Sequence, residues 1–191
     1  MLRYTGHPFV DIGVAAITEY VHRLHPNIRQ PGEVQPEHLE ELIPRIVELY
    51  MDSRMAGYLS YVVFANARFA NPAQINNPKF DAPRRNTLTH LLYMWKPGAS
   101  VPDKEEPPDE GEVCVFSGDP ASIRASRIYI PMTTDESNIN FVPEGRPRLP
   151  VAGWVLLSLL AMPLGALNSN GKLWIVHSSD PQITQFIAGQ H

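Results

Sequence analysis

The 191-residue chain has a single cysteine, and this scarcity restricts the chemistry that it can support. One cysteine excludes an internal disulfide framework, and it excludes a structural metal site built from four thiolates. The N-terminus also lacks the charged segment and following apolar segment that mark a secretory signal. We therefore expect a protein of a reducing compartment, the cytoplasm.

An excess of positive charge is missing as well, since 20 acidic residues outweigh 16 basic ones and give a net charge of −4. Binding to phosphates needs several lysines or arginines, so this composition argues against a protein that holds nucleic acid unaided. The two signs are unevenly distributed, however. Residues 66–98 carry five basic side chains and one acidic one, whereas residues 101–112 carry six acidic side chains and one lysine.

Familiar catalytic and phosphate-binding motifs are absent. The sequence contains no GxxxxGK[ST], no GxGxxG and no HExxH, and Ser117 lacks the flanking glycines of a nucleophile elbow. His7 and Asp11 are four residues apart, but no dense spacing of metal ligands surrounds them. Nucleotide-driven chemistry therefore has no support, and we expect neither a metal site nor a cofactor.

One long apolar segment is present: Leu149–Leu167 is an uncharged run of 19 residues. Pro150 and Pro163 leave about 12 residues between them for a helix, or about 18 Å at 1.5 Å per residue. The hydrocarbon core of a membrane, about 30 Å thick, is too wide for such a helix. The run therefore predicts a buried apolar helix near residues 151–162 and no membrane span.

Helical periodicity is clearest after Pro36, a residue that suits a first helical turn. Apolar side chains recur there at intervals of three and four along one face: Leu39, Leu42, Ile43, Ile46, Val47 and Tyr50. Pro44 should kink this helix. An earlier helix should begin with Asp11 as its cap and end at Pro26.

The remaining segments predict an α+β fold of mixed helices and short strands in a single domain without repeats. Residues 58–69 favour a helix and residues 87–95 a short buried element, while residues 126–133 and 172–179 are typical of strands. The proline-rich and acidic residues at about 97–112 predict an exposed linker.

Residues 71–85 contain three prolines and three asparagines, which disfavour a continuous helix or central strand and predict a long ordered loop. Asparagine amides hydrogen-bond to base edges, and lysine and arginine contact phosphates. The candidate nucleic-acid-binding residues are Asn71, Asn76, Asn77, Lys79, Arg84, Arg85 and Asn86. In such a loop, replacing both arginines should leave the fold intact. An asparagine-rich turn with solvated arginines is the alternative interpretation.

Three stretches together resemble a known family: TGHPFVDIGVAAI (5–17), CVFSG (114–118) and NFVPEGRPRLPVAGWVLLSLLAMPLGAL (140–167), the last followed by LWIVHSSD (173–180). They are similar to the CXXC-CXXC family of large subunits in type I-B CRISPR surveillance complexes, known as Cascade. The resemblance covers nearly the whole chain in order, although family members are several times longer. It implies that residues 1–191 are the N-terminal domain of such a subunit and that the C-terminal helical bundle is absent.

The family carries two CxxC pairs that bind a structural zinc, and the resemblance places them at Cys114 and Ser117 and at Ala152 and Val155. Three of the four ligands are therefore lost, and one thiolate does not hold a tetrahedral zinc. We expect an apolar contact between the CVFSG turn and the helix that contains residues 152 and 155 in place of the metal.

The resemblance also implies a role: a non-catalytic subunit that contacts the 5′ end of the crRNA and the motif flanking the target (PAM). The implied partners are crRNA, target DNA, the other Cascade subunits, and a recruited nuclease or transposition factor, in antiviral defence or guided targeting. In such complexes base pairing with the guide supplies most sequence information.

Two other functions stay open. An enzyme of unrecognised type would use some of His7, Asp11, Cys114 and His177, and it requires two of them within hydrogen-bonding distance in a cleft. A protein-binding adaptor would instead dock a partner on an apolar surface that includes Leu149–Leu167.

Overall fold

The computed structural model describes residues 1–52, 55, 58–59, 63–64, 67–70, 72–75, 77–102, 105–126, 129–130, 148–170 and 172–190. Helices and short strands alternate along these residues, which confirms the expected α+β class. In chain order the elements are α1 (Pro8–Leu24), η1 (Pro31–Glu33), α2 (Pro36–Met51), η3 (Arg68–Ala70), α4 (Pro72–Ile75), η4 (Pro78–Phe80), α5 (Asp81–Leu92), β1 (Ile123–Ala125), β2 (Leu149–Val151), α6 (Gly153–Ala161), η7 (Met162–Gly165), β3 (Leu167–Ser169), β4 (Lys172–Trp174) and α7 (Pro181–Ala188).

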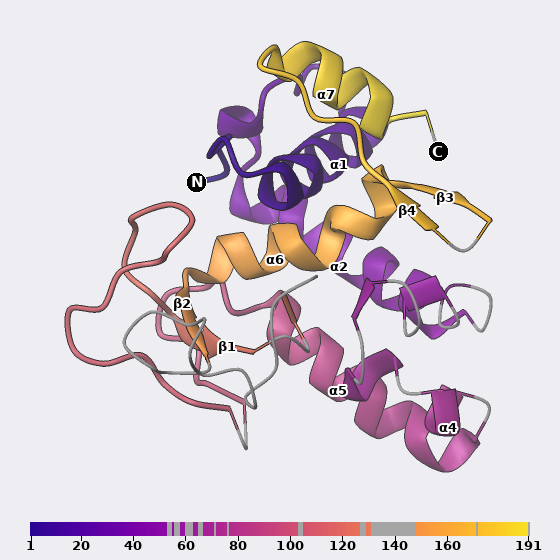
Figure 1. Ribbon diagram of the computed structural model, residues 1–191, viewed down its shortest axis with the longest axis vertical. Coiled ribbons are helices and arrows are strands. Elements are labelled where there is room, and N and C mark those ends of the chain that lie inside the picture. Colours follow the sequence, from indigo (N-terminus) through magenta and orange to yellow (C-terminus); the bar gives the residue numbers. More distant parts are fainter. Residues whose placement is uncertain are drawn as a thin grey trace.

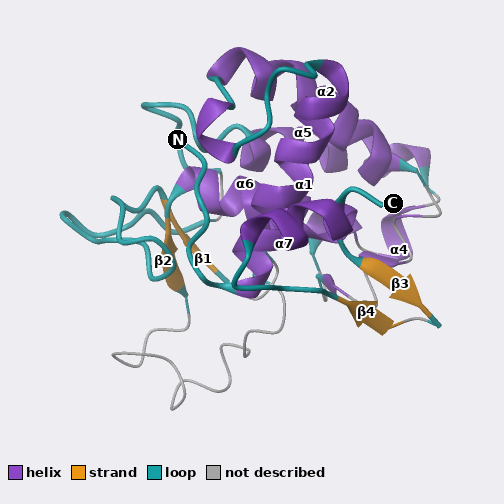
Figure 2. Ribbon diagram, turned by 90° about the horizontal axis from the view of Figure 1, so that it is seen from above, coloured by secondary structure: helices purple, strands orange, loops and turns teal. Residues whose placement is uncertain are grey.

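Helices α1 and α6 pack against each other at the centre of the molecule. Helix α7 covers α1 on one side, and α2 and α5 lie on the other (Figures 1 and 2). A glycine makes the central crossing close, because a β-carbon on Gly13 would overlap the carbonyl oxygen of Ser158. All of α6 except Trp154 is buried, which confirms the predicted apolar helix near residues 151–162.

No helix among the described residues is long and apolar enough to cross a membrane. This finding agrees with the interpretation of Leu149–Leu167 as a buried segment. The burial of this segment argues against the adaptor hypothesis. Nearly all of Leu149–Leu167 lies in the core, so the segment offers no docking surface.

Helix α2 buries the predicted face. Its buried side chains are Leu39, Leu42, Ile43, Ile46, Val47 and Tyr50, the same six that the periodicity indicated. The helix is continuous through Pro44 from Pro36 to Met51. The hydroxyl of Tyr50 donates to the carbonyl of Leu160, so the end of α2 is tied to the core helix α6.

Helix α1 begins earlier than predicted, at Pro8, so Asp11 lies in its first turn and does not cap it. Of the helix expected over residues 58–69, residues 60–62, 65 and 66 lie outside the described ranges; Tyr58, Leu59 and Val63 are helical, and residues 68–69 belong to the 3-10 helix η3. Residues 87–95 are a buried element as expected, since they form the second half of α5 and the turn that follows it.

The strands form two short antiparallel pairs at opposite ends of α6 (Figure 1). Strand β1 pairs with β2, with Ile123 opposite Val151, and β3 pairs with β4, with Leu167 opposite Trp174. The strand predicted over residues 126–133 is wrong for the residues described there, because β1 ends at Ala125. The strand predicted over 172–179 is confirmed only for residues 172–174.

More than half of the described residues of the acidic segment at about 97–112 are exposed, as the linker prediction expects, but some of its carboxylates contact β1 and its surroundings. Arg124 on β1 is 4% exposed, and it forms ion pairs with Glu106 and Glu112. Glu105 is only 2% exposed, accepts a hydrogen bond from Tyr129 at 2.7 Å and lies 3.6 Å from Arg148. The segment therefore packs on the β1–β2 pair, because buried guanidinium groups require carboxylate partners.

Candidate functional site

The predicted nucleic-acid-binding residues do not lie on one long loop. The described part of 71–86 folds into α4, η4 and the first turns of α5 (Figure 1). Prolines disfavour helix interiors but fit first turns, and Pro72, Pro78 and Pro83 all lie in first turns. The proline spacing therefore marked three helix starts. Asn71 and Asn76 lie outside the described residues.

Arg84 is part of the protein interior and is not available to a phosphate. Its side chain is 2% exposed, and its guanidinium donates to the carbonyls of Phe69 (3.1 Å) and Ile75 (3.5 Å). Asp81 lies 3.5 Å away. Burial lowers the pKa of Arg84, and the charge of Asp81 opposes that shift. The assignment of Arg84 to the binding site is therefore wrong, because α5 turns this side chain inward.

Four of the predicted residues remain at the surface: Asn77, Lys79, Arg85 and Asn86. Arg85 forms a two-nitrogen ion pair with Glu48 of α2, and this hydrogen bond lowers the pKa of Glu48 and raises that of Arg85. The Asn77 side chain accepts a hydrogen bond from the backbone of Lys79 at 3.1 Å. The Lys79 ammonium has no ion-pair partner among the described residues, so it is the one most accessible to a phosphate.

Asp11 and His177 do converge, as the enzyme hypothesis requires of at least two residues. The His177 Nε2 lies 3.0 Å from the Asp11 carboxylate, which is 4% exposed. Asp11 also accepts hydrogen bonds from the backbone amides of Thr5 (2.7 Å) and Gly6 (3.0 Å). The carboxylate therefore fastens both the loop before α1 and the segment after β4 to helix α1.

His7 lies beside this pair in an aromatic setting. Its ring packs edge-on against Phe9 and Phe116, with centroids 5.6 and 4.8 Å apart. Burial lowers the pKa of His7, the charge of Asp11 opposes the shift, and His177 adds to it. None of these three polar residues lines either cavity described below. The contacts of this cluster are therefore those of residues that hold neighbouring segments together.

Residues 114–119 form a tight turn held by backbone hydrogen bonds. The Cys114 amide donates to the Asp119 carbonyl at 2.7 Å, and Gly118, with φ 71°, donates to the Cys114 carbonyl at 2.9 Å. The turn docks on the β2–α6 junction, where the Val115 amide donates to Pro150 at 3.1 Å. The sequence analysis expected an apolar contact between the turn and the helix that contains residues 152 and 155. Backbone hydrogen bonds are among the interactions that hold it.

The four positions that the resemblance assigns to zinc are occupied by one cysteine, one serine and two apolar residues. Cys114, Ala152 and Val155 are buried in one apolar cluster. Ser117 instead accepts a hydrogen bond from the Asp119 amide at 3.3 Å. No group of three or more histidine, cysteine or acidic side chains suited to a metal occurs among the described residues.

We predict that Cys114→Ala lowers the free energy of unfolding by about 1 kcal/mol or less, because a free thiol in an apolar niche contributes only packing. Chemical denaturation of both proteins measures this difference. Elemental analysis of the purified wild type should find no stoichiometric zinc. One zinc per chain, or loss of folding in the variant, would contradict the placement of the four positions.

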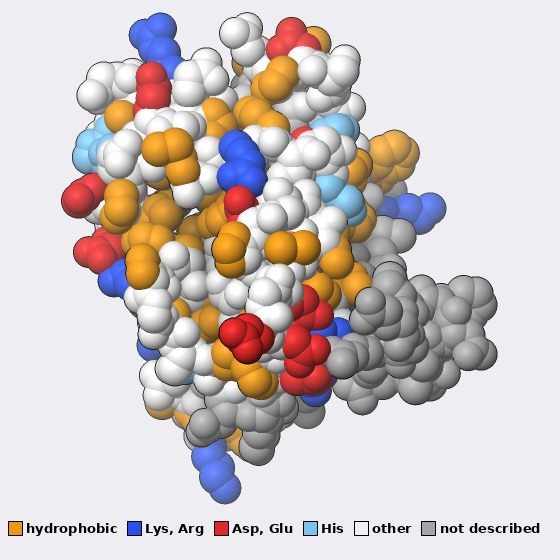
Figure 3. All heavy atoms as spheres, turned by 90° about the vertical axis from the view of Figure 1, so that its left-hand side faces the viewer, with side chains coloured by type: hydrophobic (Ala, Val, Ile, Leu, Met, Phe, Trp, Pro, Cys, Tyr) orange, Lys and Arg blue, Asp and Glu red, His pale blue; other side chains and the backbone are white. Residues whose placement is uncertain are grey.

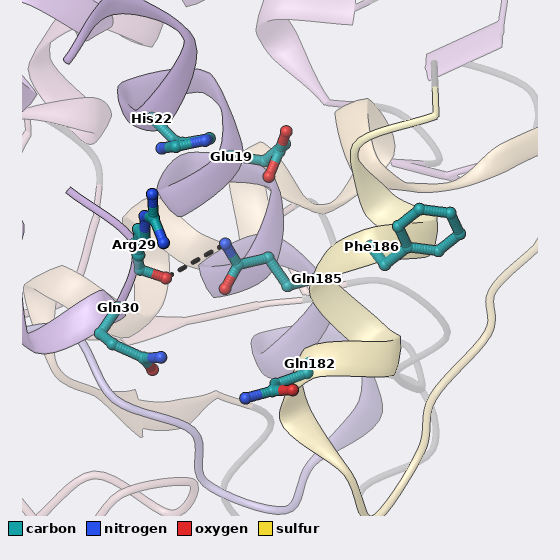
Figure 4. A pocket seen from close by; sticks show the side chains of 7 residues that line it. All are labelled: Glu19, His22, Arg29, Gln30, Gln182, Gln185 and Phe186. Carbon is teal, nitrogen blue, oxygen red and sulfur yellow. Dashed lines mark hydrogen bonds between the residues drawn. The ribbon is translucent and has the colours of Figure 1, made fainter. Parts of the chain in front are cut away.

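A polar cavity of about 390 Å³ lies between α1, the segment before η1, and α7. Gln182 and Gln185 extend from α7 toward the segment that carries Arg29 and Gln30, and the Gln185 amide donates to the Arg29 carbonyl at 3.2 Å (Figure 4). The acidic Glu19 and the basic Arg29 both line it, so its charge selects no single class of ligand.

A second, more apolar cavity of about 300 Å³ lies where the N-terminus meets α2 and α6. Its lining residues are Met1, Leu2, Val34, Gln35, Pro36, Leu39, Trp95 and Trp154. The two tryptophans come together because a β-carbon on Gly153 would overlap the Met94 carbonyl, so only glycine lets the two backbones touch. Sequence reasoning missed this site. The available signal was a glycine directly before one of only three tryptophans.

Charged side chains are unevenly spread over the surface. On the face drawn in Figure 3 several acidic side chains gather in one area, and other acidic and basic side chains are scattered over the rest of that face. Most described cations are already paired: among others, Arg3 with Asp119, Arg45 with Glu41 and Lys96 with Glu40.

Comparison with known proteins identifies no relative: no family model matches the chain, and neither a curated protein nor a solved structure is significantly similar to it.

Proposed function

We propose that this chain is the N-terminal part of the large subunit of a type I-B crRNA-guided surveillance complex. In this role it catalyses no reaction, contacts the 5′ end of the crRNA, and helps to read the motif that flanks the target. The proposal rests on the resemblance of three separate stretches to that family, and one structural observation supports it.

That observation is the way the three stretches pack together. Gly13 of the first stretch contacts Ser158 of the third, and Asp11 of the first stretch bonds to His177 beyond the third. Phe116 of the middle stretch packs on His7 of the first. Segments more than 100 residues apart thus form one continuous unit, as expected if they are the defining parts of one domain.

The charge pattern constrains how such a subunit would bind RNA. Because most described cations already have carboxylate partners, the chain alone presents few groups to phosphates. In guide complexes the RNA and the neighbouring subunits share the binding surface. We therefore expect stable association with crRNA inside the assembly and weak, salt-sensitive binding by the isolated chain.

Co-expression with a CRISPR array and the other subunits of a type I-B complex tests the proposal. Affinity purification through this chain should recover those subunits and a short RNA of guide length. Two outcomes would contradict the proposal: recovery of the chain alone, or its recovery with RNA of random length that 0.5 M salt removes.

Lys79→Ala and Arg85→Ala should weaken the salt-dependent part of RNA association, because both side chains are exposed on the η4–α5 surface. Each lost phosphate contact should reduce the slope of log K against log[salt] by about one unit. Binding titrations at four salt concentrations measure this slope.

Arg45→Ala is the matched control, since Arg45 is also an exposed arginine paired with a glutamate, but it lies on α2 outside this surface. An unchanged slope in Lys79→Ala and Arg85→Ala, or an equal change in Arg45→Ala, would remove the η4–α5 surface from the RNA interface.

A further inference from the structure

The β3–β4 pair lies at the periphery of the molecule, and one edge of β4 has no partner strand among the described residues (Figure 2). Antiparallel strands bond through every second residue, which in this register are Lys172 and Trp174 of β4. Leu173 and Ile175 therefore direct their N–H and C=O groups to the opposite edge, where neither has a backbone hydrogen bond to a described residue. Unpaired groups of this kind are a template for pairing with another strand.

The outward side chains along this edge are apolar, with one exception. Exposure alternates from residue to residue over 172–176, as in a strand with one face on the core. On the outward face Trp174 is 58% exposed and Val176 is 38% exposed. Leu167, opposite Trp174 on β3, is 39% exposed. Large apolar side chains therefore lie directly beside the open backbone groups.

Lys172 is the exception, and its charge is not compensated. It is the only lysine, arginine or acidic residue in 149–179. Its side chain is exposed and has no ion-pair partner among the described residues. A strand with an acidic side chain opposite Lys172 and apolar side chains opposite Trp174 and Val176 would complement the edge in charge and in hydrophobicity. A second copy of this edge offers no acid and adds another lysine, and lysines on edges oppose self-association.

We propose that the free edge of β4 is a docking site for an extended segment of another protein, which adds to the β3–β4 pair as a third, antiparallel strand. The segment carries an acidic side chain opposite Lys172 and apolar ones opposite Trp174 and Val176. Its backbone bonds to Leu173 and Ile175, as in other complexes formed by strand addition. A third strand stabilises a pair that is marginal by itself. Docking of this strand requires no RNA and is therefore independent of the proposed function.

A designed peptide tests the site on the full-length chain. The probe is fluorescein-Ser-Val-Thr-Ile-Thr-Glu-Ser-amide, whose valine, isoleucine and glutamate lie opposite Val176, Trp174 and Lys172 in antiparallel register. We expect saturable binding, measured by fluorescence anisotropy. Hydrogen exchange followed by NMR should show the amides of Leu173 and Ile175 exchanging about 10-fold more slowly, or slower still, when the peptide is bound. Strand addition protects both amides, because it supplies the acceptors that they lack.

Matched controls separate strand addition from unspecific apolar contact. N-methylation of both threonines keeps every side chain of the peptide and removes the two N–H groups that donate to Leu173 and Ile175, so binding should weaken about 10-fold or more. Lys172→Glu should weaken binding of the peptide by about 5-fold and favour a peptide with lysine in place of glutamate. Lys79→Glu changes an exposed lysine on η4 and should leave both affinities unchanged.

Four results would overturn the inference. They are no saturable binding, equal binding of the N-methylated peptide, an unaltered charge preference in Lys172→Glu, and concentration-dependent dimers of the free chain that the peptide dissociates. The last result, from analytical ultracentrifugation, would identify a second copy as the occupant. The proposed function is tested separately: loss of peptide binding leaves recovery of guide RNA unaffected, and peptide binding without guide RNA removes only the Cascade assignment.

Discussion

Gly13→Ala should lower the free energy of unfolding by about 3 kcal/mol or more. The added β-carbon would overlap the backbone carbonyl of Ser158. That carbonyl belongs to the backbone in the middle of a helix, so no side-chain rotation can relieve the overlap. Helices α1 and α6 must therefore separate along their whole contact. Because α6 is buried on nearly all sides, that separation disturbs most of the core.

Urea denaturation followed by circular dichroism measures this effect, with Gly32→Ala as the matched control. A β-carbon on Gly32 meets nothing within 4 Å, so the control should change stability by less than about 0.5 kcal/mol. Equal stability of the two variants would mean that α1 and α6 do not cross at Gly13.

Arg84→Ala should cost about 2 to 4 kcal/mol of stability. The guanidinium sits between the carbonyls of Phe69 and Ile75, and its removal leaves a cavity and unpaired acceptors. Arg84→Lys should also be destabilising, because an ammonium lacks the planar set of donors that reaches both carbonyls. Thermal unfolding and denaturant titration of each variant give the difference.

Arg85→Ala is the natural comparison, since Arg85 is the next residue on the same helix but is 42% exposed. It should be neutral within about 0.5 kcal/mol, as is usual for exposed ion pairs. The expectation that both arginines can be replaced without loss of folding is wrong for Arg84. A loss of RNA binding in the double variant would report unfolding, so the two positions must be tested separately. If Arg84→Ala proved as stable as Arg85→Ala, the buried position of Arg84 would be contradicted.

Periodic patterns gave the most reliable predictions. The apolar face of α2 was predicted to the residue, because side chains three and four apart share a helix face whatever surrounds the helix. The buried helix α6 followed from an uncharged run bounded by prolines. Both conclusions depend only on residues close together in the chain.

The candidate site was only partly predictable. Asn77, Lys79, Arg85 and Asn86 lie at the surface, whereas composition did not show that Arg84 faces inward. The prolines of 71–85 were interpreted as helix breakers, whereas in the structure they occupy first turns, where the missing N–H has no helical partner to lose. A proline therefore marks a helix boundary without telling on which side the helix lies.

The sequence by itself determined the α+β class, the buried face of α2, the apolar core helix and the lack of a thiolate set for zinc. The tertiary structure alone decided the partners of the polar and charged residues: Asp11 with His177, Arg84 with two backbone carbonyls, and Arg124 with the acidic segment. It also brought the apolar rings of Trp95 and Trp154 to one cavity. Most of these contacts join residues far apart in the chain. Their strength depends on burial and on the dielectric around them, and both arise only when the chain is packed.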